Sequence, residues 1–563
     1  MIISTLIFSL VPFFMILSLL IFLPLLLAGL LACLPDIFQK YFKWLVLGLG
    51  LLQLGICSWL WWIFDRQATG YQFLEQYDWI NISLGLSGKI VIGYTLGLDG
   101  VSLPMVWLTA LVMLVGSLAS FEIKEKQKAY FMLYLLLYTS IMGCFLALDF
   151  FLFFLFFEFM LLPMYFLIGL WGGPKREYAS LKFFIYTLIG SIFILIVMIG
   201  LYLSVVNPVA TALEMGYAQN ATLVTPSVIK NIQEAIAHNN LPPEALVHTF
   251  DFRYLSDFGN YLPNTLLSTT QLSLLWGLPA RYLAFLLLFI GFAIKLPMVP
   301  LHTWLPDAHV EAPTPISVVL AGILLKIGGY GLLRIGYGFF PDAAQNYAFM
   351  IGVLGTISIL YGAFNALAQN DLKRLVAYSS VSHMGFVLLG LAAFNAQGMA
   401  GAIYQLFSHG ILSAMLFLLV GVLYSRTHDR RIDSYQGLAA KMPFFTALTA
   451  IAFFASLGLP FFSGFIGEFF SLMGAFNSLL LPRWLAALAG IGLVIGAAYF
   501  LWTFQRMFFG KFWLRTDQPL TDIDAREKIM LISLAILAII FGLFPQLIFD
   551  ILNSSIPRLL NEF

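Results

Sequence analysis

Long stretches of this chain are almost wholly apolar, and charged residues gather in the intervals between them. A stretch of about 20 apolar residues is what an α-helix needs to cross the hydrocarbon core of a bilayer. The alternation of apolar and polar residues that marks a membrane β-barrel is absent. The pattern predicts an all-α polytopic membrane protein with about fourteen transmembrane helices, expected near residues 10–34, 42–64, 100–120, 129–148, 150–170, 182–205, 279–300, 313–335, 346–368, 375–394, 398–424, 443–477, 484–508 and 529–552.

The basic residues orient these helices, because Lys and Arg accumulate on the cytoplasmic side of a membrane protein. If the first helix begins outside, nineteen of the 29 Lys and Arg residues fall on the cytoplasmic side and eight on the outer side. The other two, Lys295 and Lys326, lie inside predicted helices. A miscounted helix would mix the two sides, so the asymmetry favours an even number of spans with both termini facing outward. The first 34 residues lack a basic start and a cleavage motif, so we expect a retained first helix.

Composition narrows the possible chemistry. Of 563 residues, 61% are hydrophobic and 10% are charged, and the net charge of +1 says nothing about partners. We expect no nucleic-acid partner. Cys33, Cys57 and Cys144 have no CxxC spacing, so we interpret them as small core residues and expect neither disulfides nor an iron–sulfur site. No nucleotide, haem or flavin fingerprint is found, so the chain is expected to work without a cofactor of its own.

The segments that connect the predicted helices suggest how the chain is divided into domains. Residues 206–278 are polar and carry short amphipathic pieces, which predicts a folded extramembrane insertion. We expect N-terminal helices in 1–128, a first repeat in 129–335 that contains this insertion, a second repeat in 346–508, and a connecting loop with a last helix in 509–563. Interrupted helices at matching places in two halves are typical of transporters built from inverted repeats.

Ionisable residues inside predicted helices are the candidates for function, because a charge in hydrocarbon is costly and usually faces the bundle interior. Any one of them alone could be an inward polar residue that fixes helix packing, and each histidine could be an ordinary core histidine. Acids, lysines and imidazoles on separate helices together indicate a proton path. The candidates are Glu158, Lys295, Lys326, His383, His409 and Glu468.

Prolines and glycines predict two broken helices. Pro297 and Pro300 follow Lys295 and remove backbone donors, which leaves carbonyls that only protein or a water-filled cavity can satisfy. In SLGLPFFSGFIGEFF, residues 456–470, Pro460 and two glycines precede Glu468 in the same way. One half therefore places a base after its break, and the other places an acid.

Several segments resemble a known family. The stretches FEFMLLPMYFLIGLWGG, KLPMVPLHTWLPDAHVEAPTPISVVLAGILLKIGGYG, LKRLVAYSSVSHMGFVLLG and SGFIGEF are similar to the antiporter-like subunits of proton-pumping complex I, in particular its M-type (chain 4) subunits. The similarity spans nearly the whole chain, except that a typical member lacks the 206–278 insertion. The same motifs recur in multisubunit cation/proton antiporters.

The resemblance implies roles for the candidate residues. Glu158 and Lys295 would form a coupling pair, and Lys326 would sit on a central polar axis near His383 and His409. Glu468 would open toward the exit or a neighbouring subunit. The implied function is proton translocation driven by quinone reduction elsewhere in the complex, with NADH, flavin, iron–sulfur clusters and quinone held by partner subunits.

The same resemblance implies the surroundings of the chain. Its partners would be the lipid bilayer and other membrane subunits, including neighbouring antiporter-like ones. Its membrane would be a bacterial plasma membrane, with a thylakoid or mitochondrial inner membrane as the alternatives.

Three other interpretations stay open. A free-standing cation/proton antiporter needs the same broken helices and buried charges. A structural scaffold in the membrane needs the helices alone. The segment HTWLPDAHVEAP also offers ligands for zinc, although its polar groups can instead satisfy the backbone of the broken helix; these residues are His302, Asp307, His309 and Glu311.

Overall fold

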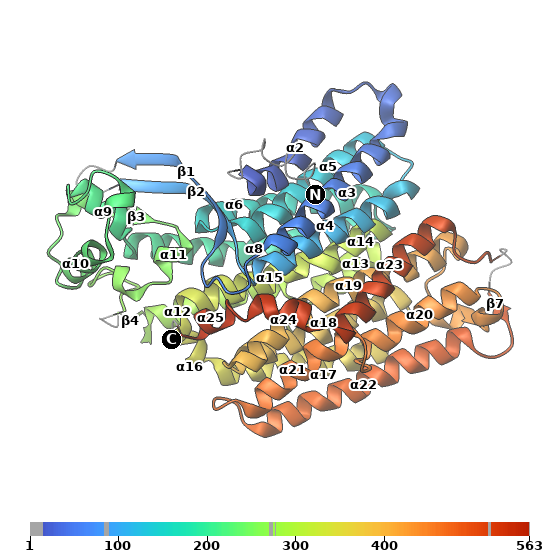
Figure 1. Cartoon of the computed structure of the whole chain (residues 1–563). Helices are drawn as coiled ribbons and strands as arrows, with labels where there is room; N and C mark the ends of the chain where they lie inside the picture. Colours follow the sequence, from blue (N-terminus) through green and yellow to red (C-terminus); the bar gives the residue numbers. More distant parts are fainter. Residues whose placement is uncertain (1–14, 84–88, 270–273, 276, 516–519, 562–563) are drawn as a thin grey trace, which may run out of the picture.

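Long apolar helices lie side by side and make up the body of the protein, which is a computed structural model describing residues 15–83, 89–269, 274–275, 277–515 and 520–561 (Figure 1). In chain order the first of them are α2 (Ile16–Cys33), α3 (Gln39–Ile63), α4 (Ser102–Ala119), α5 (Gln127–Leu146), α6 (Phe150–Phe159), α7 (Leu161–Trp171), α8 (Arg176–Ser204) and α12 (Ala280–Lys295). The later ones are α13 (Trp304–Glu311), α14 (Thr314–Val319), α15 (Leu325–Gly331), α17 (Ala348–Leu367), α18 (Leu372–Ala392), α19 (Ala396–Thr427), α20 (Pro443–Ser456), α21 (Ser463–Asn477), α22 (Arg483–Phe508), α23 (Ala525–Leu543), α24 (Gln546–Leu552) and α25 (Ile556–Asn561).

The all-helical membrane fold is confirmed. Within the described residues, eleven helices are long and apolar enough to cross a membrane, and twelve if the bent pair α23 and α24 forms one span. The predicted count of about fourteen is not confirmed. Two of the predicted windows, 279–300 and 443–477, hold helices that are interrupted and therefore short.

Burial sorts the helices into a centre and a periphery. Almost every residue of α18, of α19 and of the helix from α14 to Tyr337 is buried. In contrast, α2, α3, α8 and α22 leave large apolar side chains exposed, as a surface against lipid or neighbouring subunits requires. Three of the six candidate residues, Lys326, His383 and His409, lie on these central helices.

The first break separates Lys295 from the helix that follows. Helix α12 ends at Lys295, and α13 begins at Trp304. Protein groups satisfy the freed backbone, as predicted: the indole Nε1 of Trp304 donates to the Ile294 carbonyl at 2.9 Å. The backbone N–H of Val299 donates to Ser358 Oγ of α17 at 3.1 Å. The break is therefore stabilised by hydrogen bonds from the next helix, α13, and from α17.

The second break lies between α20 and α21. Gly458 adopts φ +78° there, a conformation that side-chain-bearing residues rarely adopt. A Cβ atom at this position would lie 2.4 Å from Oε2 of Glu468. Glycine thus lets the carboxylate of Glu468 fold back against the break. Both predicted helix interruptions are confirmed.

The helix that carries Lys326 is continuous but irregular. Between α14 and Tyr337 it has two π-helical segments, η8 (Leu320–Leu324) and η9 (Leu332–Tyr337), and Lys326 lies in α15 between them. π-Helical turns inside α-helices often occur at functional sites.

A small domain covers one end of the bundle. It combines the 206–278 segment with a hairpin between α3 and α4 that the sequence analysis did not predict (Figure 1). Strands β1 (Gln72–Ser83) and β2 (Lys89–Leu98) are antiparallel, and β3 (Val247–Thr249) pairs with β2 in parallel. The remaining elements here are α9 (Pro208–Glu214), α10 (Pro226–Ala237), α11 (Phe252–Leu255), β4 (Leu274–Leu275), β5 (Leu278–Pro279) and, beside them, α16 (Pro341–Asn346).

The opposite end of the bundle carries the basic loops. Strands β6 (Tyr435–Gln436) and β7 (Trp513–Leu514) pair there, far from the insertion (Figure 1). Residues 206–278 and the loop around Arg431 therefore lie at opposite ends of the helices, in agreement with the charge asymmetry. The proposed division into inverted repeats stays a prediction.

Candidate functional site

A buried lysine and a buried histidine form the centre of the site. Lys326 is 0% exposed, and its Nζ lies 2.7 Å from Nδ1 of His409 on α19. The same Nζ donates to the carbonyl of Ala321, in the π-helical segment η8. A protonated lysine can only donate, so when Lys326 carries its proton His409 Nδ1 accepts this hydrogen bond.

A histidine and a carboxylate form the second pair. Nδ1 of His383, on α18, lies 2.9 Å from Oε1 of Glu468, on α21. Both side chains are buried, and Glu468 is 2% exposed. Glu468 lies in the second turn of α21, not in the first turn, where the helix dipole acts most strongly. Its partner is thus the imidazole of His383, and not a helix end.

The two pairs adjoin each other. The rings of His383 and His409 are 5.4 Å apart between centroids. Lys326, His409, His383 and Glu468 therefore form one row, which we call the central row, from three separate regions of the chain. The sequence analysis named all four residues but could not place them beside one another.

Lys295 and Glu158 form a second group. Lys295 is 1% exposed, and its Nζ lies 3.8 Å from the centroid of the Phe157 ring. Glu158 is half-buried on α6, within electrostatic range of Lys295. Among the described residues no direct ion pair joins them, and Lys295 Nζ has no hydrogen-bond partner. Cys144 of α5 lies within electrostatic range of both.

The second group is adjacent to the central row. Gly328 lies two residues after Lys326, and a Cβ atom there would be 2.6 Å from the backbone nitrogen of Leu296. The helix of Lys326 therefore packs directly against the end of α12, which carries Lys295.

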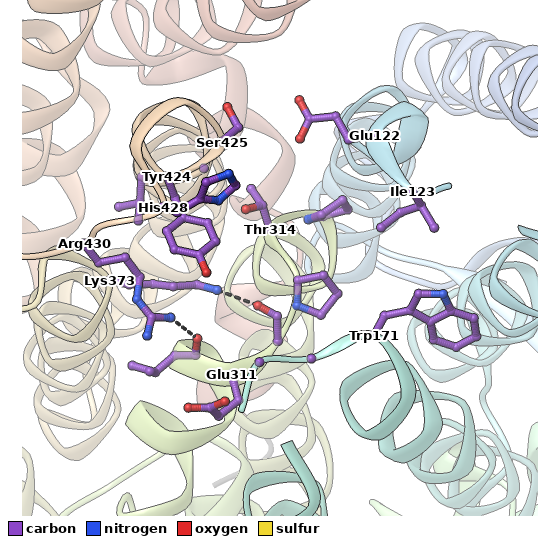
Figure 2. Close-up of a pocket in the computed structure, with 18 of the residues that line it drawn as sticks. Glu122, Ile123, Trp171, Glu311, Thr314, Lys373, Tyr424, Ser425, His428 and Arg430 are labelled. Carbon is purple, nitrogen blue, oxygen red and sulfur yellow. Dashed lines mark hydrogen bonds between the residues drawn. The ribbon is translucent and has the colours of Figure 1, made fainter. Parts of the chain in front are cut away.

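A wide cavity opens at the end of the bundle that carries the basic loops. Its volume is about 590 Å³, and Lys373, Glu311, Trp171 and His428 are among the residues that line it (Figure 2). Lys373 is buried and donates to the Ala312 carbonyl. Figure 2 shows Lys373 on one wall of this cavity, with Trp171 across from it.

A further buried histidine, His309, lies near both this cavity and the central row. It is 0% exposed, neither ring nitrogen has a partner among the described residues, and its ring stacks on Phe417 at 4.4 Å. It lies within electrostatic range of Lys373 and of Lys326. The sequence analysis considered His309 only as a zinc ligand, and its place in the row of buried bases was missed.

The other residues of that segment have structural partners. Asp307 forms ion pairs with Lys182 of α8 at 2.8 Å and with Arg374 of α18 at 2.7 Å. Glu311 Oε2 accepts the backbone N–H of Lys175 at 2.8 Å. Within the described part of the chain, no three metal-binding side chains converge. Asp307 instead joins α13 to the helices on either side of it.

Comparison with known families agrees with this arrangement. A family model described as "NADH:quinone oxidoreductase/Mrp antiporter, TM" matches residues 147–226 and 252–496, which is more than half of the chain. This chain belongs to that family. The match leaves out residues 227–251, which include most of α10 and all of β3.

Relatives with assigned names extend the match to most of the chain. An NADH-quinone oxidoreductase subunit M from Rickettsia bellii is 38% identical over 89% of this chain and 88% of its own length. The subunit M of Rhodobacter capsulatus is also 38% identical, over 89% of this chain and 86% of its own. An NAD(P)H-quinone oxidoreductase chain 4 from Synechococcus elongatus is 37% identical over 95% of this chain and 90% of its own.

Solved structures match the fold. A chain of respiratory complex I from Thermus thermophilus superposes with a TM-score of 0.75 at 28% identity, covering 97% of this chain and 100% of that one. A chain of the Mrp complex from Dietzia superposes with a TM-score of 0.74 at 21% identity, covering 97% of both chains, which shows a common fold. The antiporter-like membrane subunit anticipated from the motifs is confirmed.

Proposed function

We propose that this chain carries protons across the membrane as the M-type subunit of an NADH:quinone oxidoreductase complex, and that the central row is its path. The observation that supports this most is the contact of Lys326 with His409 beside the contact of His383 with Glu468. Four titratable groups in hydrogen-bonding pairs, buried at the middle of a helical bundle, suit proton transfer far better than packing.

Lys326 and His409 have the chemistry of a shuttle. The lysine ammonium donates a proton toward Nδ1 of His409, so transfer along this bond leaves a neutral amine and an imidazolium. On the other side, Glu468 in its ionised form accepts the Nδ1–H of His383. A proton that reaches His383 can therefore leave toward a carboxylate. The central row therefore leads from a base, Lys326, to an acid, Glu468.

Proton uptake from the cytoplasm fits the large cavity. Water in a space of about 590 Å³ would reach Lys373, which lines it, and His309 lies within electrostatic range of both Lys373 and Lys326. An imidazole whose two buried nitrogens have no partner among the described residues is suited to receive and pass on a proton. We assign Lys373 and His309 to the uptake branch.

Glu158 and Lys295 would couple this transfer to the rest of the complex. A lysine in apolar surroundings holds its proton less tightly, and a nearby carboxylate restores that affinity. Movement or neutralisation of Glu158 would thus favour proton release from Lys295. A change of about 1.4 kcal/mol accompanies each pKa unit, and moving one charge against 100 mV takes roughly 2.3 kcal/mol. A change of two or three units in the pKa of Lys295 would therefore supply enough free energy to move one proton.

The energy and the cofactors would come from partners. NADH or a related donor, flavin, iron–sulfur clusters and quinone are assigned to other subunits, and the names of relatives differ between NADH and NAD(P)H as the donor. Neighbouring antiporter-like subunits would cover part of the exposed apolar surface. The relatives are bacterial and cyanobacterial, which favours a bacterial plasma membrane, with a thylakoid membrane as the alternative.

The proposal is tested by isolating the native complex, identifying its subunits and measuring proton translocation in sealed vesicles. The complex should contain redox subunits and pump protons when a nicotinamide donor and a quinone are supplied. The absence of redox subunits would contradict the assignment.

A multisubunit cation/proton antiporter is the second candidate, because the matched family includes Mrp antiporters. Purified alone and placed in liposomes, the chain should show no robust proton exchange driven by a sodium or potassium gradient. Robust exchange would favour the antiporter over the complex I subunit.

A further inference from the structure

A buried ion pair lies at the small-domain end of the helix that carries Lys326. Nη2 of Arg334 donates to Oδ1 of Asp99 at 2.5 Å, and the two side chains are 6% and 7% exposed. Asp99 directly follows strand β2 of the small domain. Its Oδ1 also accepts the backbone N–H groups of Val101 and Ser102 at the start of α4. The pair therefore joins the helix of Lys326 to the hairpin and to α4.

Aromatic rings enclose the guanidinium of this pair. Its central carbon lies 5.5 Å from the centroid of the Tyr71 ring and 5.4 Å from that of the Tyr330 ring. Tyr330 is 1% exposed, and its hydroxyl donates to the Phe145 carbonyl at 3.3 Å. Next to it, a Cβ atom at Gly331 would lie 2.3 Å from the Phe292 ring. The helix is therefore closely packed at the level of the guanidinium.

Arg334 follows Lys326 along the same side of the helix. Steps of four residues lead from Lys326 through Tyr330 to Arg334, and residues four apart lie one above the other on an α-helix. At a rise of 1.5 Å per residue, Lys326 and Arg334 are roughly 12 Å apart along the axis. The residues between them are Ile, Leu, Gly and Tyr. Arg334 is thus the first charged group beyond Lys326 in this direction along the helix.

This direction matters because a proton gradient acts on the protein from outside. The charge asymmetry places the small-domain end on the outer side of the membrane. Protons that entered from that side and reached Lys326 could continue through the uptake branch into the cytoplasm. Such a flow would dissipate the gradient that the complex builds. The helix of Lys326 therefore needs a barrier at its outer end.

We propose that Arg334 is this barrier and that Asp99 is the positioning residue that holds it in place. A guanidinium stays protonated in proteins, so it cannot pass a proton on. A fixed positive charge in a narrow place also repels an approaching proton. The barrier deepens the proposed function and rests on it, because it protects the row of residues assigned there.

The identity of the cation distinguishes a barrier from a packing contact. A contact that only anchors the helix needs a positive charge beside Asp99, which a lysine supplies as well as an arginine does. A buried lysine, however, releases its proton readily, and an arginine does not. A barrier therefore requires arginine, whereas an anchor accepts lysine.

The test measures the passive proton permeability of sealed vesicles that contain the whole complex. A fluorescent pH indicator follows the decay of an imposed pH difference without electron donor or quinone, while potassium and valinomycin hold the membrane potential at zero. Arg334→Lys introduces a cation that can release its proton, and Arg334→Gln leaves Asp99 as an unpaired buried carboxyl that can bind one. We expect each to raise the permeability about tenfold or more.

The opposite half of the pair provides a contrasting variant. Asp99→Asn keeps an oxygen that accepts from Arg334 and caps α4, and it leaves the guanidinium protonated. We expect its permeability to stay close to that of the wild type. The order of the Arg334 and Asp99 variants therefore depends on proton chemistry and not on the loss of the ion pair itself.

Two further variants identify the route of the leak. Adding Lys326→Met to Arg334→Lys should restore low permeability, because leaking protons pass through Lys326. The matched control is Arg281→Lys. Arg281 is also a buried arginine near the small domain, and it pairs with Asp342 at 2.9 Å, but it belongs to α12. It should not raise the permeability.

Each outcome decides the proposal when permeability is normalised to assembled complex. Low permeability in both Arg334 variants would overturn the barrier and leave the proposed function intact. An equal leak in Arg281→Lys, or a leak that persists after Lys326→Met is added, would overturn the barrier in favour of a general loosening of the bundle. A leak in Asp99→Asn as large as in Arg334→Gln would show that the contact alone matters, which also overturns it. Normal redox-driven pumping in Lys326→Met would instead overturn the proposed function.

Discussion

Lys326 and His409 are 83 residues apart in the chain, yet their nitrogen atoms lie 2.7 Å apart in the buried centre of the bundle. Two basic groups at this distance cannot both be charged without strong repulsion in this buried region. At most one of the two residues therefore carries a charge. The helix of Lys326 and α19 approach closely because Gly322 and Gly410 face each other across the contact.

Proton translocation should require a side chain at position 326 that can release a proton, and not only one that carries a positive charge. Arg is permanently protonated, so Lys326→Arg keeps a cation but cannot give up a proton. We expect Lys326→Arg and Lys326→Met to lower proton translocation by about tenfold or more, equivalent to roughly 1.4 kcal/mol or more in the barrier. Assembled complex is quantified in the same vesicles. Pumping preserved in Lys326→Arg would mean that charge alone is required.

Lys295 and Glu158 should be needed for coupling and not for assembly. Lys295 Nζ has no hydrogen-bond partner among the described residues, so its removal breaks no network. We expect Lys295→Ala and Glu158→Ala to cut proton pumping far more than the amount of assembled complex, with electron transfer falling alongside. Both activities are measured per assembled complex. Normal pumping by an assembled Lys295→Ala complex would falsify the role of the pair.

Glu468 should tolerate a shorter acid better than a neutral isostere. Glu468→Asp keeps a proton acceptor for His383, Glu468→Gln removes it, and Glu468→Lys places a second base beside the imidazole. Proton translocation normalised to assembled complex should therefore fall in the order Asp, Gln, Lys. Equal activity of the Asp and Gln variants would show that Glu468 serves packing, and the path would then leave the row at His409.

The two ends of the bundle should report opposite sides of the membrane. A reporter fused after Arg431 is expected in the cytoplasm, because the basic loops gather at that end. A reporter inserted between residues 206 and 278 is expected outside. If both reporters lie on one side, the topology is wrong.

The small domain that covers one end of the bundle contacts Asp149 through Asp251, and it should lose stability as pH rises toward neutrality. Burial, together with the neighbouring Asp251 carboxylate and against the backbone N–H of Leu152, raises the pKa of the Asp149 carboxyl to about 7. A carboxyl whose pKa in the folded state exceeds the unfolded value of about 3.9 stabilises the fold while protonated, and this contribution is lost as pH rises through 7.

The measurement for Asp149 is the unfolding temperature of the solubilised complex at pH 6 and at pH 8. Asp149→Asn should weaken the fall between these two values. The control is Asp257→Asn, because Asp257 is an exposed aspartate that also caps a short helix, and it should keep the wild-type difference. An unchanged difference in Asp149→Asn would show that another group is responsible.

The sequence alone indicated a membrane protein, and it predicted the orientation of the helices and named six candidate residues. These conclusions follow from local quantities: the length of apolar runs, the side of each basic residue, and the cost of a charge or a proline within a helix. The two breaks were predicted for the same reason, since Pro297, Pro300 and Pro460 act on their own neighbours along the chain.

The tertiary structure decided which residues meet. Lys326 reaches His409 and His383 reaches Glu468 only because helices distant in sequence pack closely, and apolar sequence carries almost no record of its partners. His309 was missed because its sequence neighbours suggest a metal ligand, whereas its place between Lys373 and Lys326 depends on three separate helices. The hairpin of β1 and β2 was missed although its strands are neighbours in sequence, because strand propensity depends strongly on context, and this sheet is completed by β3 of the distant 206–278 segment.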